Sequence, residues 1–294
     1  MAMMQRRRRR ISPGWLFVGP FALLFGVFWL GPIIMSVYYS LTEWTGMSAP
    51  RFIGLANYKM LFSDERFLVA LKNTLFYVVT YNAIVLPLAL LLALGLNSSR
   101  IGKLSRVFRL MYFLPVTMIL AVVALVFDLV YARDIGLLDS ALRLIGFTGT
   151  TNLLYNKSTA MWAIIILRIW RTLGYYAVIL LAGLQSIPSD IYEAVRVDGA
   201  STFRTIWSIT LPLLRPVFLF LVVLSSIWGF QLFDEPWILL QGGPGDATLT
   251  LVQYLYQNTF LYSRLGYGAA VAYVLAILMF GVSLLQIRLM DEDN

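Results

Sequence analysis

Residues 193–216, EAVRVDGASTFRTIWSITLPLLRP, form a polar, turn-bearing stretch with a long apolar run on each side. Gly199 stands where a residue in the left-handed conformation can end a helix at low cost. We therefore expect one helix to end near Asp198, and a second, capped by Ser201, to end near Leu211 and Pro212. Because its flanks are apolar, the stretch is predicted to be a loop held outside lipid.

The composition places the whole chain in a membrane. Of its 294 residues, 60% are hydrophobic and 13% are charged, whereas soluble proteins have about 45–50% and about 25%. The sequence contains no Cys and no His, which excludes cysteine nucleophiles, histidine triads, zinc–histidine sites and disulfides. The net charge of +8 includes five consecutive arginines, Arg6 to Arg10, beside an apolar run. Membrane orientation explains that cluster better than nucleic-acid binding does.

The apolar runs predict an all-α protein with six membrane-spanning helices. A span needs about 20 mostly apolar residues, and the qualifying segments are 15–41, 69–96, 110–131, 160–184, 213–233 and 265–289. The first segment, with its basic flank, also resembles a secretory signal, but it continues to Leu41 without a clear cleavage site, so a retained anchor is expected. The domains are then a basic arm at 1–14, a helical domain at 15–289 and a tail at 290–294, with a loop at 185–212.

The basic residues predict the orientation of the spans. With the N-terminus inside, the short segment after the second span holds Arg100, Lys103, Arg106 and Arg109 without an acid. Positive charge in short loops marks the cytoplasmic side. Both termini and the 185–212 loop are therefore expected in the cytoplasm.

The 193–216 stretch also carries a motif. It matches the pattern E-A-A, three residues, G, nine residues, I-x-L-P, with Val195 in place of the second Ala. The pattern resembles the cytoplasmic EAA loop of permease subunits in binding-protein-dependent ATP-binding-cassette (ABC) importers. The resemblance implies that the loop docks on an ATPase, and it assigns the coupling residues Glu193, Ala194, Val195, Asp198, Gly199, Ile209, Leu211 and Pro212.

The resemblance covers most of the chain and is closest to carbohydrate-type permeases, such as the membrane subunits of maltose and glycerol-3-phosphate importers. The segments that carry it include FQLFDEPWILLQGGPGDAT at 230–248 and LGYGAAVAY at 265–273. It implies the type I importer permease fold.

The same resemblance implies the partners: a second homologous permease, two ATPase subunits and an extracytoplasmic substrate-binding protein. No phosphate-binding P-loop is present, because GLNSSRIGKL at 95–104 has the wrong glycine spacing and no Ser or Thr after Lys103. ATP and magnesium are therefore expected on the partner subunits. We expect no catalytic residue, metal site or cofactor in this chain.

Arg168 and Arg171 are candidates for a substrate path, because ionisable groups at membrane depth are costly. Lying three residues apart, they share one helix face. They could meet an anionic substrate, or pair structurally with Asp128 or Asp234. Asp234 and Glu235 end the fifth span, where they could be interfacial or lie on the path.

Aromatic and amide side chains supply the chemistry that binds sugars. The candidates are Trp228, Phe230 and Gln231 in the fifth span and Tyr81 and Asn82 in the second. Packing in the helix bundle is the alternative for each of them.

The sequence thus predicts a permease subunit of an ATP-driven importer for a sugar or oligosaccharide, in a bacterial plasma membrane. Import of glycerol-3-phosphate or a related phosphorylated polyol is the alternative within this class. A membrane-embedded transferase and a scaffold are the alternatives from other classes.

Overall fold

The computed structural model describes residues 13–98, 104–133, 135–146 and 151–291. In these ranges, five helices are long and apolar enough to cross a membrane, and one sharply bent helix pair makes a sixth span if it is counted as one. The all-α, multi-span architecture expected from the sequence is confirmed. Most of the basic arm, loop residues 99–103 and most of the tail lie outside the described residues.

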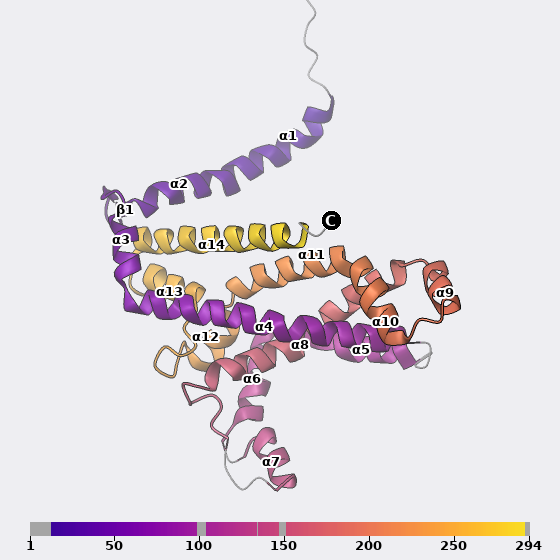
Figure 1. Ribbon diagram of the computed structural model, residues 1–294. Helices are drawn as coiled ribbons and strands as arrows, with labels where there is room; N and C mark the ends of the chain where they lie inside the picture. Colours follow the sequence, from indigo (N-terminus) through magenta and orange to yellow (C-terminus); the bar gives the residue numbers. More distant parts are fainter. Residues whose placement is uncertain (1–12, 99–103, 134, 147–150, 292–294) are drawn as a thin grey trace, which may run out of the picture.

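The first span comprises α1 (Pro13–Phe25), the π-helical turn η1 (Gly26–Leu30) and α2 (Gly31–Ser40). It stands apart from the other helices along most of its length (Figure 1), and α2 contacts α14 (Leu265–Asp291) and α3 (Ala56–Ser63). Its π turn lies directly before Gly31 and Pro32. Proline lacks an N–H and clashes with the carbonyl four residues earlier. A widened turn at this position relieves the clash while the helix continues.

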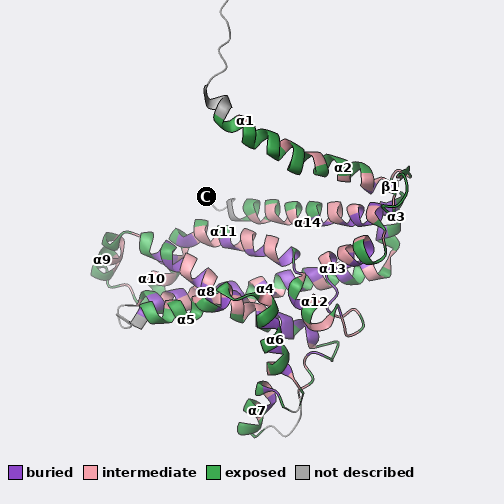
Figure 2. Ribbon diagram, turned by 180° about the vertical axis from the view of Figure 1, so that it is seen from behind, coloured by how far each residue is buried: buried purple, intermediate pink, exposed green. Residues whose placement is uncertain are grey.

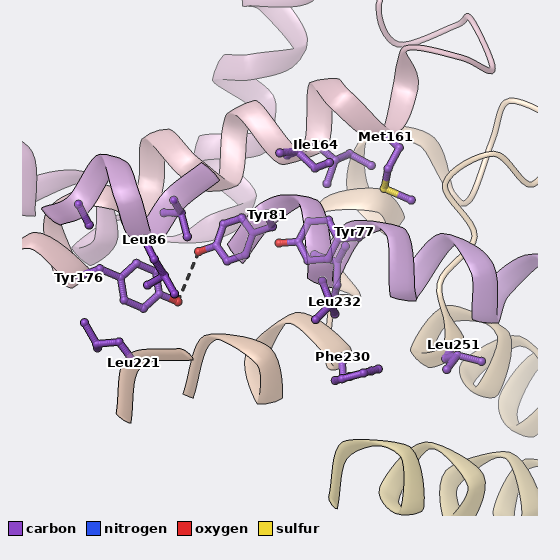
Figure 3. Packing of buried hydrophobic residues seen from close by; sticks show 14 of the residues in the cluster. Tyr77, Tyr81, Leu86, Met161, Ile164, Tyr176, Leu221, Phe230, Leu232 and Leu251 are labelled. Carbon is purple, nitrogen blue, oxygen red and sulfur yellow. Dashed lines mark hydrogen bonds between the residues drawn. The ribbon is translucent and has the colours of Figure 1, made fainter. Parts of the chain in front are cut away.

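The centre of the bundle is the pair α4 (Glu65–Asn97) and α8 (Ala160–Ser186). Asp64 begins α4 as its cap, since its carboxylate accepts from the backbone N–H groups of Arg66 (2.8 Å) and Phe67 (3.3 Å). The facing sides of α4 and α8 are buried, whereas α1 and α2 are exposed in the single chain (Figure 2). Tyr77, Tyr81 and Tyr176 are among the largest side chains of this core (Figure 3).

The third expected span, residues 110–131, is corrected by the structure. It consists of two helices, α5 (Leu104–Thr117) and α6 (Leu120–Tyr131), whose axes differ by 100°. Pro115 weakens the last turn of α5, and Ile119 is extended, with ψ at 127°. Hydropathy alone could not predict this break, because the helices on both sides of it are apolar. The short α7 (Leu137–Leu144) follows α6.

Helix α5 approaches α8 backbone to backbone at one glycine. A Cβ added at Gly174 would lie 1.9 Å from the carbonyl oxygen of Tyr112. The absence of a side chain at Gly174 is what allows this close approach.

The fifth span is longer than the expected 213–233. The helical elements α10 (Thr202–Thr205), η2 (Ile206–Thr210) and α11 (Leu211–Phe230) run on without a break, and with α12 (Asp234–Leu240) they make one candidate span. The helix expected to end near Leu211 and Pro212 therefore continues through them. The π turn η2 precedes Pro212 by the same spacing as η1 precedes Pro32, and it has the same effect.

One end of the bundle, which we name the β1 end, carries a small ribbon and short helices. Strands β1 (Thr42–Glu43) and β2 (Arg51–Phe52) pair antiparallel, with Thr42 opposite Phe52. The other elements at or from this end are α3 (Ala56–Ser63), α13 (Leu251–Tyr256), η3 (Gln257–Leu261) and the long α14 (Leu265–Asp291). The opposite end, named the α9 end, carries α9 (Ser189–Val197) (Figure 1).

Candidate functional site

Residues 189–205 form a helix–turn–helix at the α9 end, which we name the α9–α10 loop. Helix α9 ends at Val197, and Gly199 has φ at +72°, a value that glycine adopts without strain. Ser201 caps α10 by accepting from the N–H of Arg204 at 3.4 Å. The end of the first helix, the glycine turn and the serine cap predicted from the sequence are all confirmed.

The structure divides the motif residues into two groups. Glu193, Ala194, Asp198 and Gly199 are exposed together on α9 and its turn, and Val195 is half-buried beside them. In contrast, Ile209 lies in η2, and Leu211 and Pro212 begin α11. The first group is accessible in the single chain, whereas the second belongs to the helix of the fifth span.

Exposed apolar side chains beside the motif were missed in the sequence analysis. Val197, Phe203 and Trp207 are largely exposed, and the rings of Phe203 and Trp207 stack with centroids 6.3 Å apart. The spacing of four residues between two aromatics is the signal that could have found the pair. These side chains enlarge the apolar surface at the α9 end.

Arg168 on α8 forms an ion pair with Glu235 on α12. Glu235 is buried, with its side chain 1% exposed, and that of Arg168 is 16% exposed. The structural pairing expected for the arginine is therefore present, but its partner is Glu235 rather than Asp128 or Asp234. Glu235 is buried within the protein, whereas its neighbour Asp234 is exposed.

Arg171 has a different surrounding from Arg168. Its Nη2 lies 3.4 Å from the carbonyl oxygen of Met118, at the break between α5 and α6. The two arginines thus have separate partners, although they share one face of α8.

The aromatic candidates differ in accessibility. Tyr81 and Phe230 are each 1% exposed and belong to the core. The Tyr81 hydroxyl is 2.6 Å from Thr172 Oγ1 and 3.4 Å from the Tyr176 hydroxyl, the latter contact drawn in Figure 3. Trp228 is half-buried against Tyr175. Burial of Tyr81 and Phe230 fits the packing role that the sequence left open.

Two candidate residues for the substrate path are accessible at the junction of α11 and α12. Gln231 ends α11 and Asp234 begins α12, and both side chains are exposed. Among the candidate path residues in the fifth span, they are the ones that a solute can reach directly in the single chain.

Asn82 is part of a polar chain that joins three spans. Its Nδ2 donates to Val78 O at 2.8 Å and to Ser226 Oγ at 3.3 Å, while Ser225 Oγ donates to its Oδ1. Gln286 on α14 donates to Ser226 Oγ at 2.7 Å. Sequence analysis missed Ser225, Ser226 and Gln286, although polar residues inside apolar spans were a usable signal.

The β1 end is held by two carboxylates with altered acidity. Asp246 accepts from Nε and Nη2 of Arg66, each at 2.9 Å, and these hydrogen bonds lower the pKa of Asp246 against the opposing effect of burial. Burial acts to raise the pKa of Asp64. Hydrogen bonds from Tyr254 (2.6 Å) and from the backbone outweigh burial, so the pKa of Asp64 is also below its usual value.

Comparison with known proteins identifies relatives along nearly the whole chain. The family model described as "Binding-protein-dependent transport system inner membrane component" matches residues 85–290. The arabinooligosaccharides transport system permease protein AraP of Bacillus subtilis is 38% identical over 277 residues, covering 94% of this chain and 87% of the relative. The probable ABC transporter permease protein YurN of the same organism is 37% identical, covering 96% of each chain. The lactose transport system permease protein LacF of Rhizobium radiobacter is 37% identical, covering 93% and 92%.

The fold has a close counterpart among solved structures. A chain of a bacterial ABC transporter that imports the acidic polysaccharide alginate superposes with a TM-score of 0.84 at 23% identity, covering 96% of this chain and 97% of that one. That likeness supports the type I importer permease fold. Together with the family match and the relatives above, it leads to one conclusion: the chain belongs to the family of inner-membrane permease components of binding-protein-dependent ABC transporters.

Proposed function

We propose that this chain is one permease subunit of an ATP-driven importer for a sugar or oligosaccharide. The observation that carries the proposal is the α9–α10 loop, in which an acid, small residues and a left-handed glycine are exposed together at one end of the bundle. The names of AraP and LacF support the substrate class. The chain itself supplies no catalysis, and ATP and magnesium are bound by partner subunits.

The proposed assembly places the α9 end, with both termini, in the cytoplasm of a bacterial cell. There the α9–α10 loop enters a groove of an ATPase subunit, a common way to bind a helix. Glu193, Ala194, Val195, Asp198 and Gly199 make this contact, while Ile209, Leu211 and Pro212 pass the motion to α11. A second homologous permease completes the pore, a second ATPase serves that permease, and a substrate-binding protein docks at the β1 end.

The substrate path within this proposal uses Trp228, Gln231 and Asp234, which combine an aromatic face with polar groups. The alternative substrate, glycerol-3-phosphate or a related phosphorylated polyol, was suggested by the positive charges of the intramembrane arginines. Since Glu235 neutralises Arg168, the argument for an anionic substrate is weakened, and a neutral sugar is favoured.

The test is reconstitution of the chain with its second permease, ATPases and binding protein in lipid nanodiscs. ATPase activity is measured with neutral sugars, oligosaccharides and glycerol-3-phosphate. Stimulation by a binding protein loaded with a neutral sugar supports the proposal, and stimulation by glycerol-3-phosphate alone favours the alternative. If no ATPase assembles with the chain, the transferase and scaffold hypotheses replace it.

A further inference from the structure

A recess whose lining is more apolar than polar, but which carries several polar groups, lies between the α9–α10 loop and the ends of α4 and α8. Its volume is about 380 Å³, within the range of about 300–1,000 Å³ usual for small-molecule sites. The side chains important for its chemistry are Asn97, Tyr192, Arg196, Thr202, Thr205 and Thr210. The recess is on the side of the loop that faces α4 and α8, and neither Arg168 nor Glu235 is among its described lining residues.

Among the residues that the structure describes, the lining combines one positive charge with several hydroxyl groups. Arg196, an exposed side chain, contributes a guanidinium, and none of the described lining residues carries a carboxylate. Among the residues that the structure describes, none forms an ion pair or side-chain hydrogen bond with Arg196. The acids of α9 nearest to it, Glu193 and Asp198, are exposed and do not line the recess.

These groups match the chemistry of a phosphorylated sugar or polyol. A guanidinium binds a phosphate through two parallel hydrogen bonds, and hydroxyl and amide side chains bind sugar hydroxyls. Asn97 on α4 and Thr202 on α10 are also without a side-chain hydrogen bond in the described part of the chain, so both can serve a ligand. They belong to different elements of its lining.

The walls belong to parts that must move relative to one another if the loop couples ATP hydrolysis to transport. One wall is the end of α4 and α8, and the other is α9 with α10 and η2. The hydroxyls of Tyr192 on α9 and Thr210 in η2 lie 3.3 Å apart at its edge. A ligand that contacts both walls would resist displacement of the loop, because that displacement would break its contacts.

We propose that this recess binds a small phosphorylated sugar or polyol and that its occupancy restrains the α9–α10 loop, which lowers ATPase activity. The regulatory part rests on the proposed function of the loop. The ligand is then a product of the class of reactions that phosphorylates sugars after entry, so the recess acts as a feedback site. The phosphate of a lipid headgroup has the same chemistry and is separated in the test.

The experiment uses the full assembly in nanodiscs of zwitterionic lipid. Binding of glucose 6-phosphate and glycerol-3-phosphate is measured by calorimetry, with glucose as the unphosphorylated control, and ATPase activity is measured in parallel. We expect saturable binding of a phosphorylated probe and a lowered ATPase rate. R196Q should weaken binding at least about tenfold, as loss of a charged hydrogen bond does, and N97L should weaken it from the wall formed by α4 and α8.

Arg204→Gln is the matched control, because Arg204 is an exposed arginine of α10 that does not line the recess. It should bind the probe as the parent protein does. Absence of saturable binding by both phosphorylated probes overturns the proposal, as does binding that R196Q and N97L leave unchanged.

A second arm replaces part of the zwitterionic lipid with anionic lipid. An ATPase change that depends on anionic lipid and on Arg196, without binding of either soluble probe, assigns the recess to a lipid headgroup and overturns the metabolite proposal. An assembly without any ATPase activity contradicts the proposed function instead. Calorimetric binding is independent of that activity, so the two failures are distinguishable.

Discussion

The guanidinium of Arg168 on α8 and the buried carboxylate of Glu235 on α12 form an ion pair across 67 residues of sequence. The pair fixes α12, the last helix of the fifth candidate span, against α8. Removing one partner of a buried ion pair leaves the other charge without compensation, which costs more than the pair contributes.

Replacing Glu235 with Gln should therefore destabilise the protein by about 3–5 kcal/mol. Asp234→Asn is the matched control, because this neighbouring acid is exposed and should change stability by less than about 0.5 kcal/mol. The combined change Arg168→Met with Glu235→Gln should recover much of the loss, because it removes both charges. Thermal unfolding in detergent measures all three, and equal midpoints for E235Q and D234N would contradict the role of the pair.

Gly174→Ala should disrupt the contact between α5 and α8. An added Cβ lies 1.9 Å from the carbonyl oxygen of Tyr112, so the two helices must separate, and a loss of about 1–3 kcal/mol is expected, as for other overpacked sites. Gly95→Ala on α4 meets nothing within 4 Å and should be neutral or slightly stabilising through helix propensity. Unfolding midpoints of the two variants give the comparison, and a neutral G174A would show that the helices are not in close contact.

Gly199→Val should impair coupling through the backbone alone. No atom lies within 4 Å of an added Cβ, but φ is +72°, which a β-branched residue adopts only with strain of about 1–3 kcal/mol. Gly199→Asn should retain activity, since Asn tolerates this conformation. We expect G199V to insert normally while losing at least about tenfold of the sugar-stimulated ATPase rate, and equal loss in G199N would point to a contact of the glycine itself.

Glu193→Lys tests the docking surface by charge. Glu193 is exposed on α9 beside the motif alanine, so reversing its charge should leave stability within about 0.5 kcal/mol and abolish stimulation of the ATPase. Asp190→Lys is the matched control on the same helix, outside the motif. Co-purification of the ATPase and its stimulated rate are the measurements. Normal stimulation in E193K would count against the docking role.

The β1 end should lose stability in acid. The pKa of Asp246 is lowered by its hydrogen bonds to Arg66, so the ionised form stabilises the fold above the usual carboxyl pKa of about 4. This contribution declines as the pH falls through the lowered pKa. Both side chains are partly exposed, which limits it to about 1 kcal/mol. The unfolding midpoint of the parent should exceed that of D246N at pH 5–8, and the two should converge below about pH 4; a constant difference would exclude ionisation as its source.

The sequence by itself determined the class of the fold and the position of the motif. The long apolar runs place the chain in a membrane, where no water is available to hydrogen-bond the backbone. Each span must therefore satisfy its own backbone N–H and C=O groups, and a helix does so. The turn at Gly199 and the cap at Ser201 were predictable because both effects act within a few residues. Local interactions are visible in a local stretch of sequence.

The features that only the tertiary structure shows are contacts between residues far apart in the chain. The packing of the helices pairs Arg168 with Glu235 instead of Asp128 or Asp234. It also bends the third span between Thr117 and Leu120, and it brings Asn97 and Arg196 into the lining of one recess. Hydropathy could not distinguish the two adjacent acids, because composition does not record the direction in which α12 turns each side chain. That direction follows from how the helices pack, and packing is fixed only when distant spans meet.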